Sequence, residues 1–243
     1  MSVAIKIRQV KKMFREMRKV RVSDYENFLS KKYKFGNPDN SFIIRHYDDD
    51  VVRQEMLWAY PNDKETLAGR GFGVTADGHF KYELLLPTPA TKDDMEDFMK
   101  FACELAKYMR ATEIEIDGKF VAIKDIESKK EIVNQMQELN KNQLENLIGN
   151  YERAGVFTGS FHPVYLPRDE YNKIKNAKSE DVMAIFAGLL DKFQIRDIEK
   201  YTFMEPMFYQ NRENQRIQGV YTFEEGNVSI LPKEPYIPAN IRL

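Results

Sequence analysis

The sequence predicts an α+β fold, in which four to five amphipathic helices pack on one or more antiparallel β-sheets. The clearest evidence is the run 69–126, which has the order strand, turn, strand, long helix, strand, turn, strand. Both turns contain an Asp-Gly pair, Asp77-Gly78 and Asp117-Gly118, and such pairs are typical of tight hairpin turns. Because strands joined by a tight turn pair antiparallel, the two hairpins favour an antiparallel sheet.

Each element of this run has a local signal. Apolar residues predict strands at 71–75 and 79–86, and two prolines after the second strand end its pairing. Thr91 opens a long helix, and the second hairpin pairs 112–116 with 120–123. The helix carries one apolar stripe that we expect to pack on the sheet: Met95, Phe98, Met99, Ala102, Leu105, Ala106 and Met109.

The N-terminal segment begins with a half-buried strand at 2–8, where apolar and basic residues alternate. The following stretch, 10–20, fits helical spacing, but its last residues also fit a strand, and both alternatives stay open. Ser23 and Glu26 form a capping box, in which each side chain satisfies a backbone amide at a helix start. We therefore expect a short helix from 24 to about 32.

The region before the first hairpin is punctuated by turn residues. Gly, Asn, Pro and Asp at 36–40 predict a loop. A strand is expected at 41–47. The stretch 51–60 fits either a strand or a helix, and the Pro-Asn-Asp sequence after it ends the element.

The second half begins with a helix at about 128–148 that stops at Gly149. We predict that residues 1–243 form a single compact α+β unit. If the unit has two sub-halves, they are 1–126 and 150–243, and this helix joins them.

The C-terminal half continues with a strand at 156–166 and a short helix at 169–175. Ser179 caps another helix, whose broad apolar face predicts a core position. Two further strands, 200–210 and 216–223, are expected to pair across a polar loop. They are rich in aromatic side chains, which are enriched at protein interfaces, as is methionine.

Composition points to a soluble protein of the cytoplasm. Cys103 is the single cysteine, so an intrachain disulfide is excluded. The N-terminus lacks the apolar core of a signal peptide, and the longest apolar stretch, 182–190, is far shorter than the roughly 20 residues of a membrane span. We expect no membrane association.

Charge is distributed unevenly along the chain. The first 36 residues carry eleven lysines and arginines against three acids, a balance of +8, so the remainder balances to −9. Such asymmetry indicates either a contact with nucleic acid or an anionic surface, or packing against the protein's own acidic body. The candidate contacts are five basic residues: Lys11, Lys12, Arg15, Arg18 and Lys19.

A candidate ligand site lies on the first hairpin and consists of Arg70, His79, Tyr82 and Glu83. The glycines at 69–73 do not form a phosphate loop, because they lead into a strand rather than a helix. We interpret them as a bulge or a close approach of two backbones.

The sequence shows no catalytic constellation. Ser160 and His162 share a strand face, but the nucleophile elbow of a serine hydrolase is absent. The three histidines lack the spacing of a zinc site, so we expect no metal and no cofactor. The function predicted from these observations is a non-enzymatic protein-interaction or adaptor module. Its partner is another protein, or a second copy bound through a sheet edge or the aromatic C-terminal strands.

Two other functions remain as alternatives: a small-ligand binder or enzyme using the first hairpin, and a nucleic-acid or anionic-surface binder using the basic segment. The sequences 2–7, 22–26, 71–72 and 85–94 resemble an uncharacterised family of bacterial cytoplasmic proteins, mainly from Gram-positive bacteria. That resemblance implies no activity and assigns no functional residue.

Overall fold

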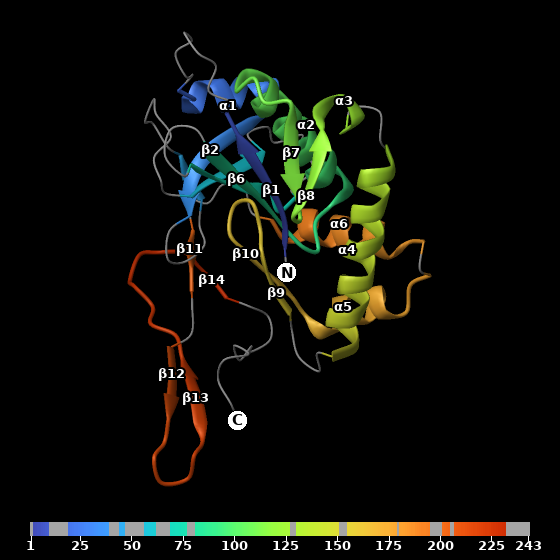
Figure 1. The fold of residues 1–243 in the computed structure, drawn as a ribbon. Helices are drawn as coiled ribbons and strands as arrows, with labels where there is room; N and C mark the ends of the chain where they lie inside the picture. Colours follow the sequence, from blue (N-terminus) through green and yellow to red (C-terminus); the bar gives the residue numbers. More distant parts are fainter. Residues whose placement is uncertain are drawn as a thin grey trace.

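The computed structural model describes residues 2–9, 19–38, 44–46, 56–61, 69–76, 81–126, 130–150, 155–178, 180–194, 201–204 and 207–231. It confirms the α+β fold, with one large antiparallel sheet and helices packed on it (Figure 1). A second group of helices with a small hairpin lies beside the sheet, and a long two-stranded arm projects from the body.

The large sheet has eight strands, and every neighbouring pair in it is antiparallel. The N-terminal strand β1 lies between β6 and β7, and its Ile5 is opposite Leu84. In spatial order the strands are β3 (Ile44–His46), β2 (Tyr33–Pro38), β4 (Leu57–Pro61), β5 (Phe72–Ala76), β6 (Lys81–Pro87), β1 (Ser2–Arg8), β7 (Glu113–Ile116) and β8 (Lys119–Ala122).

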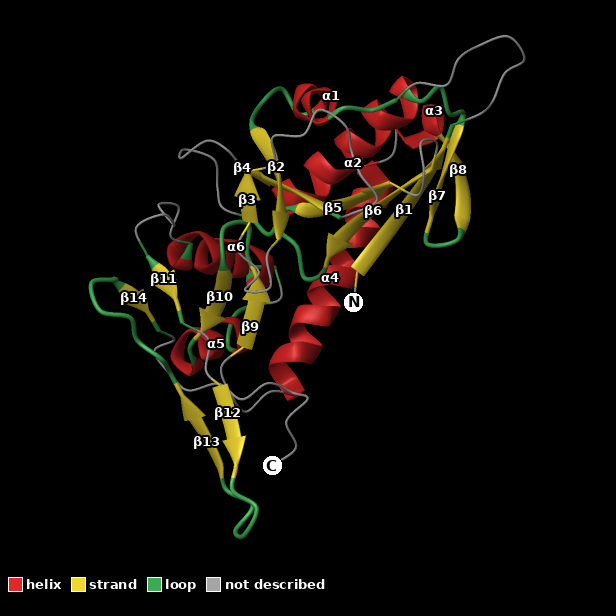
Figure 2. Ribbon diagram, turned by 90° about the vertical axis from the view of Figure 1, so that its left-hand side faces the viewer, coloured by secondary structure: helices red, strands yellow, loops and turns green. Residues whose placement is uncertain are grey.

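Two helices, α1 (Val22–Phe28) and α2 (Lys92–Tyr108), cover one face of this sheet (Figure 2). The predicted stripe of α2 is confirmed, since all seven of its apolar residues are buried. Phe101 of α2 lies at the centre of an aromatic cluster and has ring centroids within 6 Å on four sides, those of Tyr25, Phe28, Phe35 and Phe72. The single turn α3 (Ile123–Ile126) follows β8.

A second apolar core forms beyond the sheet. It contains the hairpin of β9 (Gly155–Thr158) and β10 (Pro163–Leu166), together with α5 (Arg168–Lys175) and α6 (Val182–Phe193). The long helix α4 (Lys130–Asn150) contributes Met136 to the first core and Leu144 to the second. This position suits the expected joining helix, while the division into two sub-halves stays a prediction.

The C-terminal region forms two separate strand pairs. β11 (Thr202–Phe203) pairs in parallel with β14 (Ser229–Ile230). β12 (Met207–Gln210) and β13 (Ile217–Val220) form an antiparallel hairpin, which Figures 1 and 2 show extending away from the rest of the molecule. We call this hairpin, residues 207–220, the arm.

Two predictions near the N-terminus were wrong. The helix α1 begins at Val22, where the Asp24 carboxylate accepts the amide of Arg21, so Ser23 and Glu26 are not its capping box. It also ends at Phe28, because Ser30 and Lys31 adopt positive φ angles of 59° and 61°. Residues 36–38 of the expected loop belong instead to β2, in which Tyr33 and Phe35 are buried in the core, and residues 39–40 lie outside the described residues.

Further corrections concern three other segments. The expected single strand at 156–166 is a hairpin, closed where the Gly159 amide donates to the carbonyl of His162 at 3.2 Å. The element at 51–60 includes a strand over Leu57–Pro61, whereas 51–55 lie outside the described residues. In the C-terminal pair only 207–210 and 217–220 join each other, and Thr202–Phe203 pairs with β14 instead.

Candidate functional site

Arg70, predicted to contact a ligand, is directed into the protein. Its Nε donates to the carbonyl of Thr158 and its Nη1 to that of Pro89, both at 2.8 Å. The guanidinium also lies 5.8 Å from the ring centroid of Phe157. Burial lowers the pKa of Arg70 to about 10. The side chain therefore joins the start of β5 to β9, with its hydrogen bonds directed to backbone carbonyls.

Tyr82 and Glu83, two further residues of the predicted ligand site, do not lie beside Arg70. Tyr82 and Glu83 follow each other on β6, so Tyr82 is buried in the core while Glu83 is exposed on the opposite face. Register pairs Gly73 with Leu85, which places Arg70 beyond the end of β6 that is remote from Tyr82. His79 lies outside the described residues.

The predicted basic contacts are described only at Lys19, which is exposed and whose carbonyl accepts the Tyr108 hydroxyl at 3.2 Å. Lys11, Lys12, Arg15 and Arg18 lie outside the described residues. The nearby alternation of lysines and aromatics at 31–35 forms the start of β2, where Tyr33 and Phe35 are buried. These two rings stabilise the core and are closed to stacking nucleobases.

Ser160 and His162 lie in the β9–β10 turn, and their side chains contact different backbone carbonyls. The Ser160 hydroxyl donates to the carbonyl of Gly69 at 2.7 Å. His162 Nδ1 lies 2.7 Å from the carbonyl of Pro163, and because a carbonyl only accepts, Nδ1 carries the proton. The His162 ring stacks on Phe203 with centroids 4.0 Å apart. Both residues therefore fix the turn to neighbouring segments.

Burial lowers the pKa of His162 below its ordinary value of 6.5. The unfolded chain binds this proton first, so the resulting loss of stability begins as pH falls below 6.5 and is complete below the folded pKa. We expect the free energy of unfolding to decrease between about pH 7.5 and 5.5, and His162→Asn to remove that part of the decrease. Urea unfolding at the two pH values measures it, and equal pH slopes for both proteins would contradict the assignment.

Asp94 is a buried carboxylate that sequence reasoning missed as a site residue. Its Oδ2 accepts the amides of Arg70 (2.9 Å) and Thr91 (3.1 Å) and the Thr91 hydroxyl (2.8 Å), and its Oδ1 accepts the Gly71 amide at 2.9 Å. Burial raises the pKa of Asp94, and these hydrogen bonds oppose the rise. The Thr91-x-x-Asp94 spacing is a capping-box signal for one of these contacts.

The glycines beside Asp94 confirm the predicted close approach. A Cβ on Gly69 would lie 2.3 Å from Asp94 Oδ1, and Gly71 has a φ of +69° and lies against the carbonyl of Ala59. The missing side chain of Gly69 lets the Asp94 carboxylate approach the main chain, and that of Gly71 lets the backbone of β4 approach.

Asn140 of α4 completes a polar seam between the two cores, which we define as Arg70, Asp94, Asn140 and Ser160. Its Oδ1 accepts the amide of Ala90 and its Nδ2 donates to the carbonyl of the same residue, both at 2.6 Å. Asn140 is fully buried. The side chains of the polar seam form hydrogen bonds mainly with backbone atoms, so they hold segments of the main chain together.

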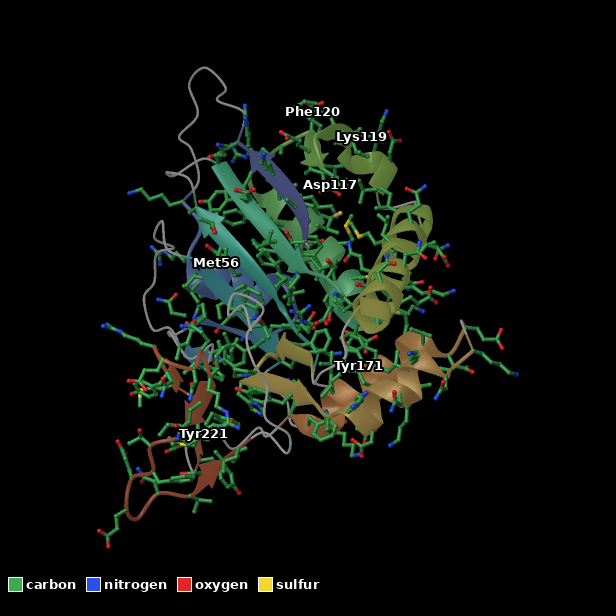
Figure 3. All side chains as sticks on the ribbon, turned by 90° about the horizontal axis from the view of Figure 1, so that it is seen from below. Met56, Asp117, Lys119, Phe120, Tyr171 and Tyr221 are labelled. Carbon is green, nitrogen blue, oxygen red and sulfur yellow. The ribbon has the colours of Figure 1, made fainter. Side chains whose placement is uncertain are left out.

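Exposed apolar side chains gather on the arm and on the segment that follows it, residues 221–231. Among all the described residues, eight large hydrophobic side chains are exposed. Five of them belong to residues 207–231, in which no residue is buried: Met207, Tyr209, Phe223, Val228 and Leu231. Figure 3 shows Tyr221 at the base of the arm and the exposed Phe120 on the far side of the molecule. The two apolar surfaces are therefore separate.

The arm is ordered by its own hydrogen bonds. Its two strands are joined by four residue pairs, which run from Met207 opposite Val220 to Gln210 opposite Ile217. At the tip, Asn211 Oδ1 accepts the amides of Glu213 (2.8 Å) and Asn214 (3.3 Å). Neither strand contains a charged residue or a proline. The arm thus presents to solvent a preformed β-ribbon whose two strands are uncharged.

The family model for Domain of unknown function (DUF4299) matches residues 2–242. The chain belongs to this family. The DUF4299 match spans the elements from β1 to β14, so the arm lies within the family's domain. This confirms the resemblance to an uncharacterised family. No curated protein and no solved structure matches the chain.

The DUF4299 chain also has a hollow of about 350 Å³ between α2, α4 and α6. Its apolar lining comes from Met95, Met183, Ala184 and Ala187. The charged lining is two lysines and two glutamates, Lys92, Lys141, Glu138 and Glu180, so opposite charges balance there.

The described residues of this DUF4299 chain contain neither a candidate membrane span nor a candidate metal cluster. None of its described helices is both long and apolar enough to cross a membrane. Within the same residues, no three His, Cys, Asp or Glu side chains gather in a way that could hold a metal ion.

Proposed function

We propose that this protein is a non-enzymatic protein-interaction or adaptor module of the bacterial cytoplasm, and that the arm is its binding element. The single cysteine and the resemblance to bacterial cytoplasmic proteins support the location. The roles of the buried polar groups support a non-enzymatic function, because Arg70, Asp94 and Ser160 are all engaged by main-chain atoms.

The observation that carries the proposal is the exposed arm, whose two strands carry no charged residue. A two-stranded hairpin alone is marginally stable in water, since neither of its faces is covered. Native sheets protect exposed edges with charged side chains or proline, and β12 and β13 have neither. A partner strand that joins such an edge gains main-chain hydrogen bonds and covers apolar side chains.

Replacing residues 208–219 by Gly-Ser-Gly is expected to abolish partner binding while the body stays folded. Because no residue of the arm is buried, the free energy of unfolding should change by less than about 0.5 kcal/mol. Affinity capture from native cytoplasm, at low and high salt, should recover at least about tenfold less partner with this variant than with the full chain.

The matched control is Phe120→Ser, which removes the exposed ring on the far side and should leave capture unchanged. Recovery of the same proteins by the armless variant and the full chain would overturn the proposal. Loss of capture that is steep in salt and independent of the arm would instead favour the basic segment as the binding element.

A further inference from the structure

We propose that the partner of the arm is a second copy of this chain, bound antiparallel through residues 216–224 about a two-fold axis at Val220. This inference rests on the proposed function of the arm and names its occupant. The two arms together would form a four-stranded antiparallel sheet with β13 of each copy at its centre.

The first argument is a difference between sequence and structure. The alternation from Arg216 to Phe223 predicts one strand, yet β13 ends at Val220, and residues 221–224 pair with no strand in the part of the chain that the structure describes. Phe223 is 60% exposed. Residues 221–223 continue the strand pattern beyond β13, and we take this to indicate that they pair with a strand of another chain in an assembly.

The second argument is the direction of the backbone groups. The carbonyl of Arg216 accepts the amide of Asn211 at 2.8 Å, so the backbone of Arg216 faces the β12 side. Because these groups alternate along a strand, those of Ile217 and Gly219 face away from β12. The outer edge of β13 is thus directed to a further strand, and within the described residues its sheet has no third strand.

The third argument is self-complementarity. With Val220 opposite its own copy, Ile217 lies opposite Phe223, and Gly219 lies opposite Tyr221, all on one apolar face. The backbone groups of these residues are those that face outward, so the register satisfies hydrogen bonding and side-chain matching together.

The fourth argument is charge. In this register Arg216 of each copy lies opposite Glu224 of the other, which gives two oppositely charged pairs at the ends of the interface. Both side chains are exposed, and the Glu224 carboxylate accepts a hydrogen bond from Asn227 Nδ2 of its own turn at 2.9 Å. Antiparallel pairing therefore joins opposite charges, whereas parallel pairing of the same strands would join like charges.

Sedimentation equilibrium of the full chain tests this inference. We expect a dimer for the wild type and a dissociation constant raised about tenfold by either Arg216→Glu or Glu224→Arg, because each variant creates two like-charge pairs. An equimolar mixture of the two variants should dimerise as tightly as the wild type, since both of its cross-pairs again have opposite charges. Arg212→Glu, at the tip and outside 216–224, is the matched control and should change the constant less than twofold.

Two outcomes would overturn the inference. One is a wild-type chain that stays monomeric at all concentrations up to about 200 μM, or a dimer that neither charge variant weakens. The other is a mixture of variants that dimerises no better than each alone. A monomer that still captures other proteins through its arm overturns the second copy as partner but leaves the proposed function standing, so the two failures are distinguishable.

Discussion

Asp94→Ala is expected to lower the free energy of unfolding by about 4 kcal/mol. The carboxylate accepts hydrogen bonds from three amides and one hydroxyl, and removing it leaves these donors buried without an acceptor. It also removes the negative charge that faces the buried Arg70 guanidinium. Urea unfolding followed by circular dichroism gives the change.

Asp93→Ala is the matched control, because Asp93 occupies the same first turn of α2 and is exposed. It should lower the free energy of unfolding by less than about 0.5 kcal/mol. If the two variants showed the same small decrease in the free energy of unfolding, the carboxylate of Asp94 would not hold the start of β5 to the start of α2.

Arg70→Met is expected to cost about 3 kcal/mol of unfolding free energy. The buried carbonyl of Pro89 and the partly buried carbonyl of Thr158 would each lose a charged donor. The single tryptophan, Trp58, reports the change directly, because its Nε1 donates to the carbonyl of Arg70 at 2.9 Å. Its fluorescence during urea unfolding gives the midpoint.

Lys100→Met removes a positive charge from the exposed face of α2 and serves as the control, with an expected change of less than about 0.5 kcal/mol. The comparison separates a structural Arg70 from one that binds a ligand. A ligand contact predicts normal unfolding for Arg70→Met, so an unchanged midpoint would return the first hairpin to consideration as a binding site.

The elements predicted correctly are those whose signals are local. The long helix begins at its Thr91 cap, and the second hairpin turns at Asp117-Gly118, because cap and turn preferences act over a few residues. β2 was missed because its pairing is remote: Gly36 pairs with Trp58 on one side and with His46 on the other. A strand whose neighbours are unknown resembles a loop when it contains Gly, Asn and Pro.

The roles of the side chains in the polar seam also depend on residues that are distant in the sequence, so local patterns do not predict them. Asn140 lies in a helix rich in Asn and Gln, and only the position of Ala90, 50 residues away, distinguishes it from its neighbours. The turn at Ser160 has no Asn-Gly or Asp-Gly pair and is fixed by a bond to Gly69, 91 residues earlier. Such roles depend on the assembled fold, so spacing along the chain does not reveal them.

The helix α4 has a consequence for how this chain can change in length. Met136 and Leu144 enter different cores eight residues, or about 12 Å, apart along one continuous helix. Each added or deleted residue between them would rotate one end by about 100° relative to the other. Leu144 would then face water, and the C-terminal part of α4 would lose its packing in the second core. The length of α4 between these two contacts is therefore fixed: we expect it to tolerate substitutions on its solvent-exposed face but not insertions or deletions.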